Sequence, residues 1–196
     1  MSSGFWTDTN SETMSDPKRK FRFTVQFTNV ENFIWYAKTA AKPSFQIATA
    51  EHKYLNHTFY YPGSVTWQDV TITMVDPGEP DVAATLSDVL RTSGYKLPAG
   101  PTDSELGTMS KSQAVSALGA VIVTQLDAEG SPIEKWTLHN AFLTEVKYGE
   151  LEYGGDDLTE YSVTFKYDWA SLEPGGASVL DGGVGPDGTE YFSVAG

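Results

Sequence analysis

The sequence contains no cysteine among its 196 residues. Disulfide bonds, a thiol nucleophile and thiolate metal ligands are therefore excluded. No apolar run approaches the ~18 residues that a membrane-spanning helix needs. The polar N-terminal stretch also lacks the basic-then-apolar order of a signal peptide. These absences predict a soluble protein that is made in the cytoplasm and has no membrane partner.

Basic residues are scarce, since 13 Lys and Arg stand against 26 Asp and Glu, for a formal net charge of −13. The imbalance is greatest at residues 148–196, where ten acids face Lys166 alone. Because nucleic-acid affinity comes largely from Lys and Arg at phosphates, a nucleic-acid-binding protein is disfavoured. The one basic cluster, at residues 18–22, is interpreted as the solvated start of a strand or as an ion-pair partner for acids elsewhere.

Motifs that carry chemistry are also missing. His52, His57 and His139 show no spacing that suits a metal ion. No phosphate loop, dinucleotide fingerprint or nucleophile elbow occurs. The Gly-rich stretch 182–189 matches a calcium-binding repeat that works only as stacked copies, and the acids at 150–152 and 156–157 are interpreted as solvated turns. The sequence therefore predicts no enzymatic activity, no cofactor and no metal.

What the sequence has in abundance is aromatic and β-forming residues. Aromatic residues make up 13% of the chain, and several segments alternate apolar and polar side chains at the period of a half-buried strand. Such strands are predicted at 21–27, 33–39, 65–75 and 158–169, whereas 142–151 is less regular. Segments 120–126 and 133–138 flank turn residues at 127–132, which predicts a β-hairpin. The chain is thus predicted to be mainly β.

Between residues 80 and 94 the apolar period changes to 3.6, which predicts one amphipathic helix at about 80–93 that covers the β-sheet. Pro80 suits its first turn and Gly94 its C-terminal cap. Residues 95–115 are predicted to form a long loop. The chain is predicted to be a single domain over 1–196, with an N-terminal arm at 1–19, a β core with the helix at 20–170 and a Gly-rich C-terminal arm at 171–196. Four apolar residues define the buried stripe of the helix: Val82, Leu86, Val89 and Leu90.

The stretch 42–77 carries more apolar surface than a solvated loop should. Pro43 and the pair Pro62-Gly63 interrupt its strand pattern, which argues against a simple hairpin. Another surface is therefore expected to cover residues 42–61, either within the chain or on another copy.

The order of the motifs resembles a known family. AKTAA at 37–41 is followed by GSVTWQDVTITMVD at 63–76, then by the helix, and later by KYGELEYGGDDLTEYSVTFKYDW at 147–169. Together with the strands between them, these motifs cover most of residues 20–170. The arrangement is similar to that of the tail tube proteins of contractile-tailed bacteriophages of the T-even kind.

The resemblance implies an antiparallel β-sandwich or barrel-like fold with one flanking helix and extended termini. It also implies homo-hexameric rings that stack into the inner tube of a virion, assembled in the host cytoplasm with tail sheath, baseplate and terminator proteins. DNA would pass through this tube, and acids facing the lumen would keep phosphate from adhering. The candidate lumen acids are Glu150, Glu152 and Glu160. Candidate contacts between subunits or rings are Phe5, Trp6, Phe45, Ile47, Tyr54, Leu55, Phe59, Tyr60, Tyr191 and Phe192.

Two alternatives remain open at this level. Within the same class, the chain could be the tube protein of a related contractile injection system or a baseplate protein that starts the tube. In a different class, it could be a carbohydrate-binding β-sandwich, because exposed Trp and Tyr can stack on sugar rings. A sugar-binding module should be monomeric with an aromatic platform, whereas a tube protein should bury its aromatic residues between subunits.

Overall fold

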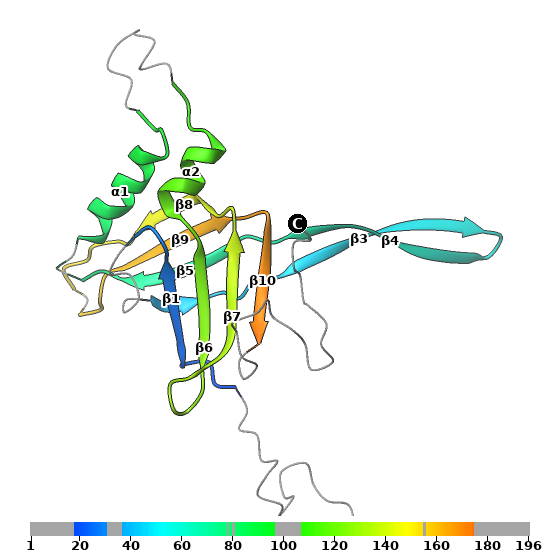
Figure 1. Ribbon diagram of the computed structural model, residues 1–196, viewed down its shortest axis with the longest axis horizontal. Helices are drawn as coiled ribbons and strands as arrows, with labels where there is room; N and C mark the ends of the chain where they lie inside the picture. The colour runs from blue at the N-terminus through cyan, green and yellow to red at the C-terminus, as the bar shows by residue number, and fades with distance from the viewer. Residues whose placement is uncertain are drawn as a thin grey trace, which may run out of the picture.

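The computed structural model describes residues 18–30, 37–77, 79, 81–96, 107–154 and 156–174. Two four-stranded antiparallel sheets form the body of the molecule (Figure 1). The first sheet, in the order β1-β6-β7-β10, consists of β1 (Phe23–Phe27), β6 (Val121–Leu126), β7 (Pro132–His139) and β10 (Trp169–Pro174). The second sheet, in the order β2-β5-β9-β8, consists of β2 (Ala37–Ala40), β5 (Val70–Val75), β9 (Glu160–Lys166) and β8 (Phe142–Tyr148). The prediction of a mainly β, antiparallel fold is confirmed.

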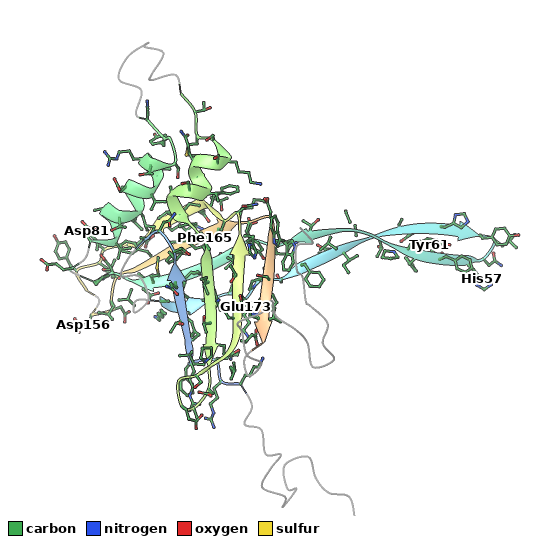
Figure 2. The ribbon with its side chains drawn as sticks, viewed as in Figure 1. His57, Tyr61, Asp81, Asp156, Phe165 and Glu173 are labelled. Atoms are coloured by element: carbon green, nitrogen blue, oxygen red, sulfur yellow. The ribbon has the colours of Figure 1, made fainter. Side chains whose placement is uncertain are left out.

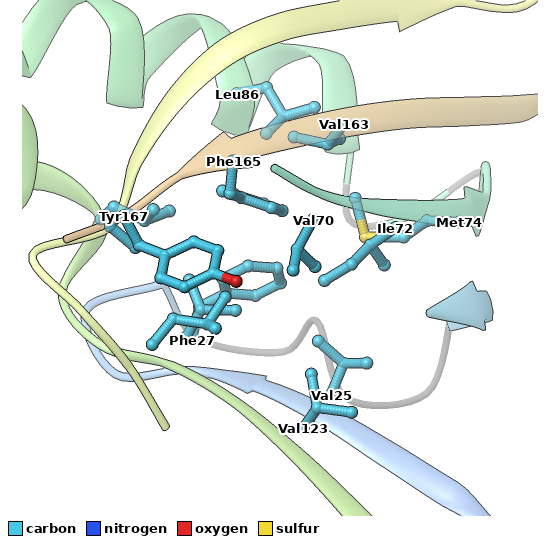
Figure 3. Packing of buried hydrophobic residues seen from close by; sticks show 14 of the residues in the cluster. Val25, Phe27, Val70, Ile72, Met74, Leu86, Val123, Val163, Phe165 and Tyr167 are labelled. Atoms are coloured by element: carbon cyan, nitrogen blue, oxygen red, sulfur yellow. The ribbon is translucent and has the colours of Figure 1, made fainter. Parts of the chain in front are cut away.

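The hydrophobic core lies between the two sheets (Figure 3). Val25 and Phe27 of β1 pack against the second sheet, and the rings of Phe27 and Phe165 lie 5.5 Å apart. β5 buries Ile72 and leaves the neighbouring Thr71 exposed, as the alternation in the sequence predicts. Because each sheet has one apolar face, burying the two faces against each other supplies the main driving force for folding.

The predicted hairpin at 120–138 is confirmed as β6 and β7, which pair from Val121 with Leu138. The carboxylate of Asp127 accepts hydrogen bonds from the backbone N–H groups of Glu129 and Ser131, at 3.0 and 2.7 Å. Gly130 adopts a φ of 85°, which an L side chain disfavours. The turn residues thus fix the connection as expected.

The predicted helix is confirmed as α1 (Val82–Thr92), which buries three residues of its expected stripe but leaves Leu90 partly exposed. The side chain of Asp81 caps it by accepting from the Ala84 N–H at 3.0 Å, and Gly94 has the expected positive φ. Pro80 lies outside the described residues. α1 lies beside one end of the sheets (Figure 1).

A second helix, α2 (Lys111–Leu118), corrects the prediction of a single flanking helix and of a loop throughout 95–115. The side chain of Ser110 accepts from the Gln113 N–H, and Gly119 ends the helix at a φ of 75°. Only Leu118 of this helix is buried, so its sequence carries almost no apolar stripe. That is the physical reason why periodicity did not reveal it.

Three predicted strand boundaries were wrong. The segment 65–75 is two strands, because the chain turns at Gln68 and Asp69 before β5 begins. The segment 158–169 is likewise divided at Tyr167 and Asp168, and β10 continues to Pro174, into the predicted C-terminal arm. Phe21 precedes β1 and is 70% exposed, instead of sharing the buried face of that strand. The stretch 142–151, expected to be less regular, contains β8.

Candidate interaction surface

A two-stranded arm leaves the body of the molecule and carries exposed aromatic side chains along its length (Figures 1 and 2). The arm, residues 45–67, consists of β3 (Phe45–Tyr54) and β4 (His57–Trp67). Every residue of β3, and every residue of β4 before Trp67, is exposed. Because two strands alone are marginally stable in water, the arm stands to gain from a partner surface.

The arm is a hairpin with a bulge, so the strand pattern is interrupted as expected, but the two strands still pair with each other. The register shifts between Ile47 and Thr49, and Thr49 pairs with Pro62. Proline lacks an N–H, and a bulge is one of the few places where a strand tolerates it. A Cβ on Gly63 would lie 3.0 Å from the carbonyl oxygen of Ala48. The Pro-Gly pair therefore builds the bulge instead of ending the strand.

The register sets which side chains share a face, because residues paired across two strands point to the same side. The pairs are Phe45 with Trp67 and Ile47 with Val65 before the bulge, and Ala50 with Tyr61, His52 with Phe59 and Tyr54 with His57 after it. Across the bulge β4 advances three residues where β3 advances two, so the extra residue lies in β4 and β3 keeps its alternation. The four residues before the bulge, the base patch, therefore lie on the opposite side of the arm from the six after it, which form the apolar face. The polar face, opposite those six, carries Glu51, Lys53, Thr58 and Tyr60.

Leu55 stands at the tip of the arm, where it is 86% exposed and has a φ of 51°. This left-handed conformation costs a residue other than glycine roughly 1–2 kcal/mol. Strain of this kind persists where the surroundings or the function require the side chain. The tip thus presents a large apolar side chain at a position where glycine would relax the turn.

The base of the arm is fixed to the body by aromatic packing. The ring of Trp67 lies 5.3 Å from the ring of Phe45 and 5.9 Å from that of Tyr167, which belongs to the body. The Gln68 N–H donates to the carbonyl of Ser44 at 2.8 Å, which closes the base. These contacts set the direction in which the arm leaves the sheets.

A buried carboxylate reinforces the base. Glu134 of β7 is only 8% exposed and accepts hydrogen bonds from Lys18, from Lys42 at 2.7 Å and from the indole N–H of Trp136. Burial alone would raise the pKa of Glu134, but these donors outweigh it and lower the pKa to about 2. The carboxylate therefore ties the start of β1 and the segment leading into the arm to the first sheet.

The arm brings together six of the predicted contact residues, all exposed. Tyr54 and Phe59 lie on the apolar face and Leu55 at the tip, whereas Phe45 and Ile47 belong to the base patch and Tyr60 lies on the polar face. Sequence reasoning left Tyr61 out of the predicted contacts and assigned Val65 to a buried strand, yet both are exposed, Tyr61 on the apolar face and Val65 in the base patch. The four remaining candidates lie outside the described residues: Phe5, Trp6, Tyr191 and Phe192. That any of these residues contacts another copy stays a prediction.

The three candidate lumen acids occupy two different environments. Glu150 and Glu152 lie exposed in the connection between β8 and β9. Glu160 begins β9 and pairs with Lys38 of β2, and this hydrogen bond raises the pKa of Lys38. Their orientation toward a lumen stays a prediction.

The described residues include no group of His, Asp and Glu that could hold a metal ion. His52 and His57 stand on the arm, whereas His139 stacks on Trp169 with ring centroids 5.3 Å apart. Burial lowers the pKa of His139. In the part of the chain that the structure describes, neither helix is long and apolar enough to cross a membrane.

No family model matches the chain, and no curated protein matches its sequence. Solved structures do match it. A chain in the cryo-EM structure of the anti-feeding prophage (AFP) baseplate, 6-fold symmetrised, has a TM-score of 0.60 at 16% identity, over 82% of this chain and 98% of that chain. A chain in the extended PVC sheath-tube complex, an extracellular contractile injection system, has a TM-score of 0.59 at 15% identity, over 86% of this chain and 99% of that chain. A chain in the AFP tube-terminating cap has a TM-score of 0.56 at 17% identity, over 84% of this chain and 99% of that chain.

These likenesses define the fold, which this chain shares with chains in the AFP baseplate, the AFP tube-terminating cap and the PVC sheath-tube complex. They support the tail-tube-like architecture that the sequence motifs implied. They do not single out T-even phages.

Proposed function

We propose that this protein is a non-catalytic structural subunit of the inner tube of a contractile, tail-like particle. Six copies form a ring, and rings stack head to tail into a hollow tube. The observation that carries the proposal is the arm, whose apolar side chains are exposed from Phe45 to the tip at Leu55. Stacked rings would cover these side chains, since the arm reaches well beyond the body (Figure 1).

Three further observations support this reading. The AFP baseplate structure is 6-fold symmetrised, which fits a ring of six copies. A head-to-tail contact between unlike surfaces closes into rings or continues into filaments, which matches a protruding arm on one side of the body. The formal net charge of −13 would weaken contacts between a tube wall and the phosphates of passing DNA.

The particle is either a phage tail that conducts DNA or an injection particle of another kind. The sequence motifs favour a virion assembled in the host cytoplasm, and the solved structures favour an extracellular injection system. In both cases the proposed partners are sheath, baseplate and terminator proteins. Nuclease-resistant DNA in particles purified with this subunit would assign it to a phage, and particles free of DNA would assign it to an injection system.

The decisive experiment is electron microscopy of the purified protein, combined with sizing by light scattering. Rings of six or hollow tubes are expected. A concentrated sample that stays strictly monomeric would count against the proposal and would favour the carbohydrate-binding alternative. In that case a glycan array should show binding that depends on Phe59 and Tyr61 of the arm.

A further inference from the structure

A hollow in the body offers a second contact between copies, separate from the arm. A cavity of about 640 Å³ opens between β1 and β2, which are edge strands of the two sheets. Its floor is apolar and includes Phe21, Phe23, Val123 and Trp136. Phe21 is 70% exposed there, although large apolar side chains are normally buried. The described chain thus leaves this floor open.

The rim of the cavity is basic, with Lys18, Lys20, Lys38 and Lys42 around it. The acids that pair with these lysines are Glu134 and Glu160. Asp157 also acts electrostatically on Lys38. Four positive charges against these three negative ones still leave a cationic rim, and Lys20 makes no ion pair among the described residues. An occupant that complements the cavity should combine apolar side chains with carboxylates.

The chain itself contains such an element. The acidic loop, residues 149–159 between β8 and β9, carries Leu151, Tyr153 and Leu158, which are 89%, 114% and 71% exposed. The loop has no basic residue. Four carboxylates lie between and beside the apolar residues: Glu150, Glu152, Asp156 and Asp157. The loop lies at one end of the second sheet, near the label of Asp156 (Figure 2).

The neck of the acidic loop is closed, and the pKa of Lys38 at the cavity rim of the same chain is raised chiefly by Glu160 and to a smaller extent by Asp157 beyond the neck. A Cβ on Gly149 would lie 2.7 Å from the carbonyl oxygen of Glu160. Only glycine permits this approach of the two strands. The three apolar side chains beyond the neck are left uncovered by the described part of their own chain.

We infer that the acidic loop of one copy docks into the lysine-rimmed cavity of a second copy. Leu151, Tyr153 and Leu158 cover the apolar floor, and the carboxylates meet the lysines. Each copy carries one loop and one cavity, so every copy can join two neighbours. The inference rests on the proposed self-assembly and names a contact for it. It also places Glu150 and Glu152 between copies and not on a lumen wall.

The test uses the absence of native cysteine. Tyr153→Cys and Phe21→Cys are made in separate full-length chains, mixed and oxidised. Disulfide-linked dimers that contain one chain of each kind are expected to exceed those of either variant alone by roughly tenfold, because only unlike sites meet. Glu129→Cys, on the exposed turn between β6 and β7, replaces the loop variant as the matched control and should not crosslink with Phe21→Cys.

Charge reversal gives an independent readout. Glu150→Lys with Glu152→Lys should weaken association roughly tenfold or more, and Lys20→Glu in the same chain should restore part of it. Tubes that form normally with the reversed loop and show no mixed crosslink would overturn the docking inference and leave the proposed tube intact. Alkylation of the Phe21→Cys variant alone gives a further check. If its thiol resists alkylation until residues 1–17 or 175–196 are deleted, the chain's own ends fill the cavity and the inference is also overturned.

Discussion

Thr49 pairs with Pro62 across the arm, and this one-residue shift in register puts Phe59 and Tyr61 on the same face as Tyr54. Without the shift, Thr49 would pair with Gly63, and Tyr60 would share that face in place of Phe59 and Tyr61. The bulge therefore gathers aromatic side chains on one face of the outer part of the arm. A single local feature of the backbone thus defines the surface that the proposed function depends on.

The tip of the arm gives the first prediction. Replacing Tyr54 and Leu55 together by Asp should block tube formation but leave the circular dichroism spectrum and the unfolding midpoint unchanged. Both side chains are exposed, so their loss should alter the free energy of unfolding by less than ~0.5 kcal/mol. The matched control is Lys53→Asp with Thr58→Asp on the polar face, which should still form tubes. Loss of folding would place Tyr54 and Leu55 in the core of the monomer.

Leu55 should also separate stability from assembly. Leu55→Gly relieves a φ of 51° and should leave the free energy of unfolding unchanged or raise it by up to ~1 kcal/mol. The same change removes an exposed apolar side chain and should raise the critical concentration for assembly. Leu55→Met is the control, since it keeps the apolar contact and the strained turn. Tubes of the glycine variant that form at the wild-type concentration would remove Leu55 from the contact.

Phe165 tests the core between the two sheets. It is 1% exposed and packs against Phe27, so Phe165→Ala should lower the free energy of unfolding by about 3–5 kcal/mol. Urea unfolding followed by fluorescence measures this change. Met109→Ala, at an exposed position, should shift it by less than ~0.5 kcal/mol. A loss below ~1 kcal/mol at Phe165 would contradict the packing of the two sheets.

Glu134 should make stability depend on pH. Its pKa is lowered from 4.5 to about 2, so its contribution is complete above pH 4.5 and is lost as the pH falls toward 2. Glu134→Gln should lower the free energy of unfolding at pH 7 by about 1.5–3 kcal/mol and flatten the slope below pH 4.5. Urea unfolding at several pH values measures both effects. Glu129→Gln on an exposed turn is the control, and an unchanged acid slope in the Glu134 variant would contradict the assignment.

The body of the fold could be predicted from the sequence because its strands are short and half-buried. In β5 and β9, fully buried side chains alternate with less buried ones, and that period is visible in a single sequence. Helix α2 could not be predicted, because it buries only Leu118 and lacks an apolar stripe. The excess of apolar residues at 42–61 could be seen in the sequence, but the sequence did not show that these residues form an arm that leaves the body.

The arm was missed as a hairpin because its pairing depends on a bulge. A pattern of strict alternation cannot accommodate the shift at Thr49 and Pro62, so Pro62-Gly63 was interpreted as an interruption. The acidic loop and the lysine-rimmed cavity were missed for another reason. Leu151 and Tyr153 stand between acids in the sequence, which suggests a solvated turn, and no local pattern reveals the open floor between β1 and β2.

The arm has only two strands, and its apolar face rests on nothing within the described part of its own chain. In the proposed tube, a copy that joins a finished end finds a covering surface at once. Free copies that begin a new tube must order several arms together before any of them is covered. Initiation should therefore show a lag, whereas elongation from an existing end should not. Tube length would then be governed by the proteins that start and stop growth, and much less by the supply of subunits.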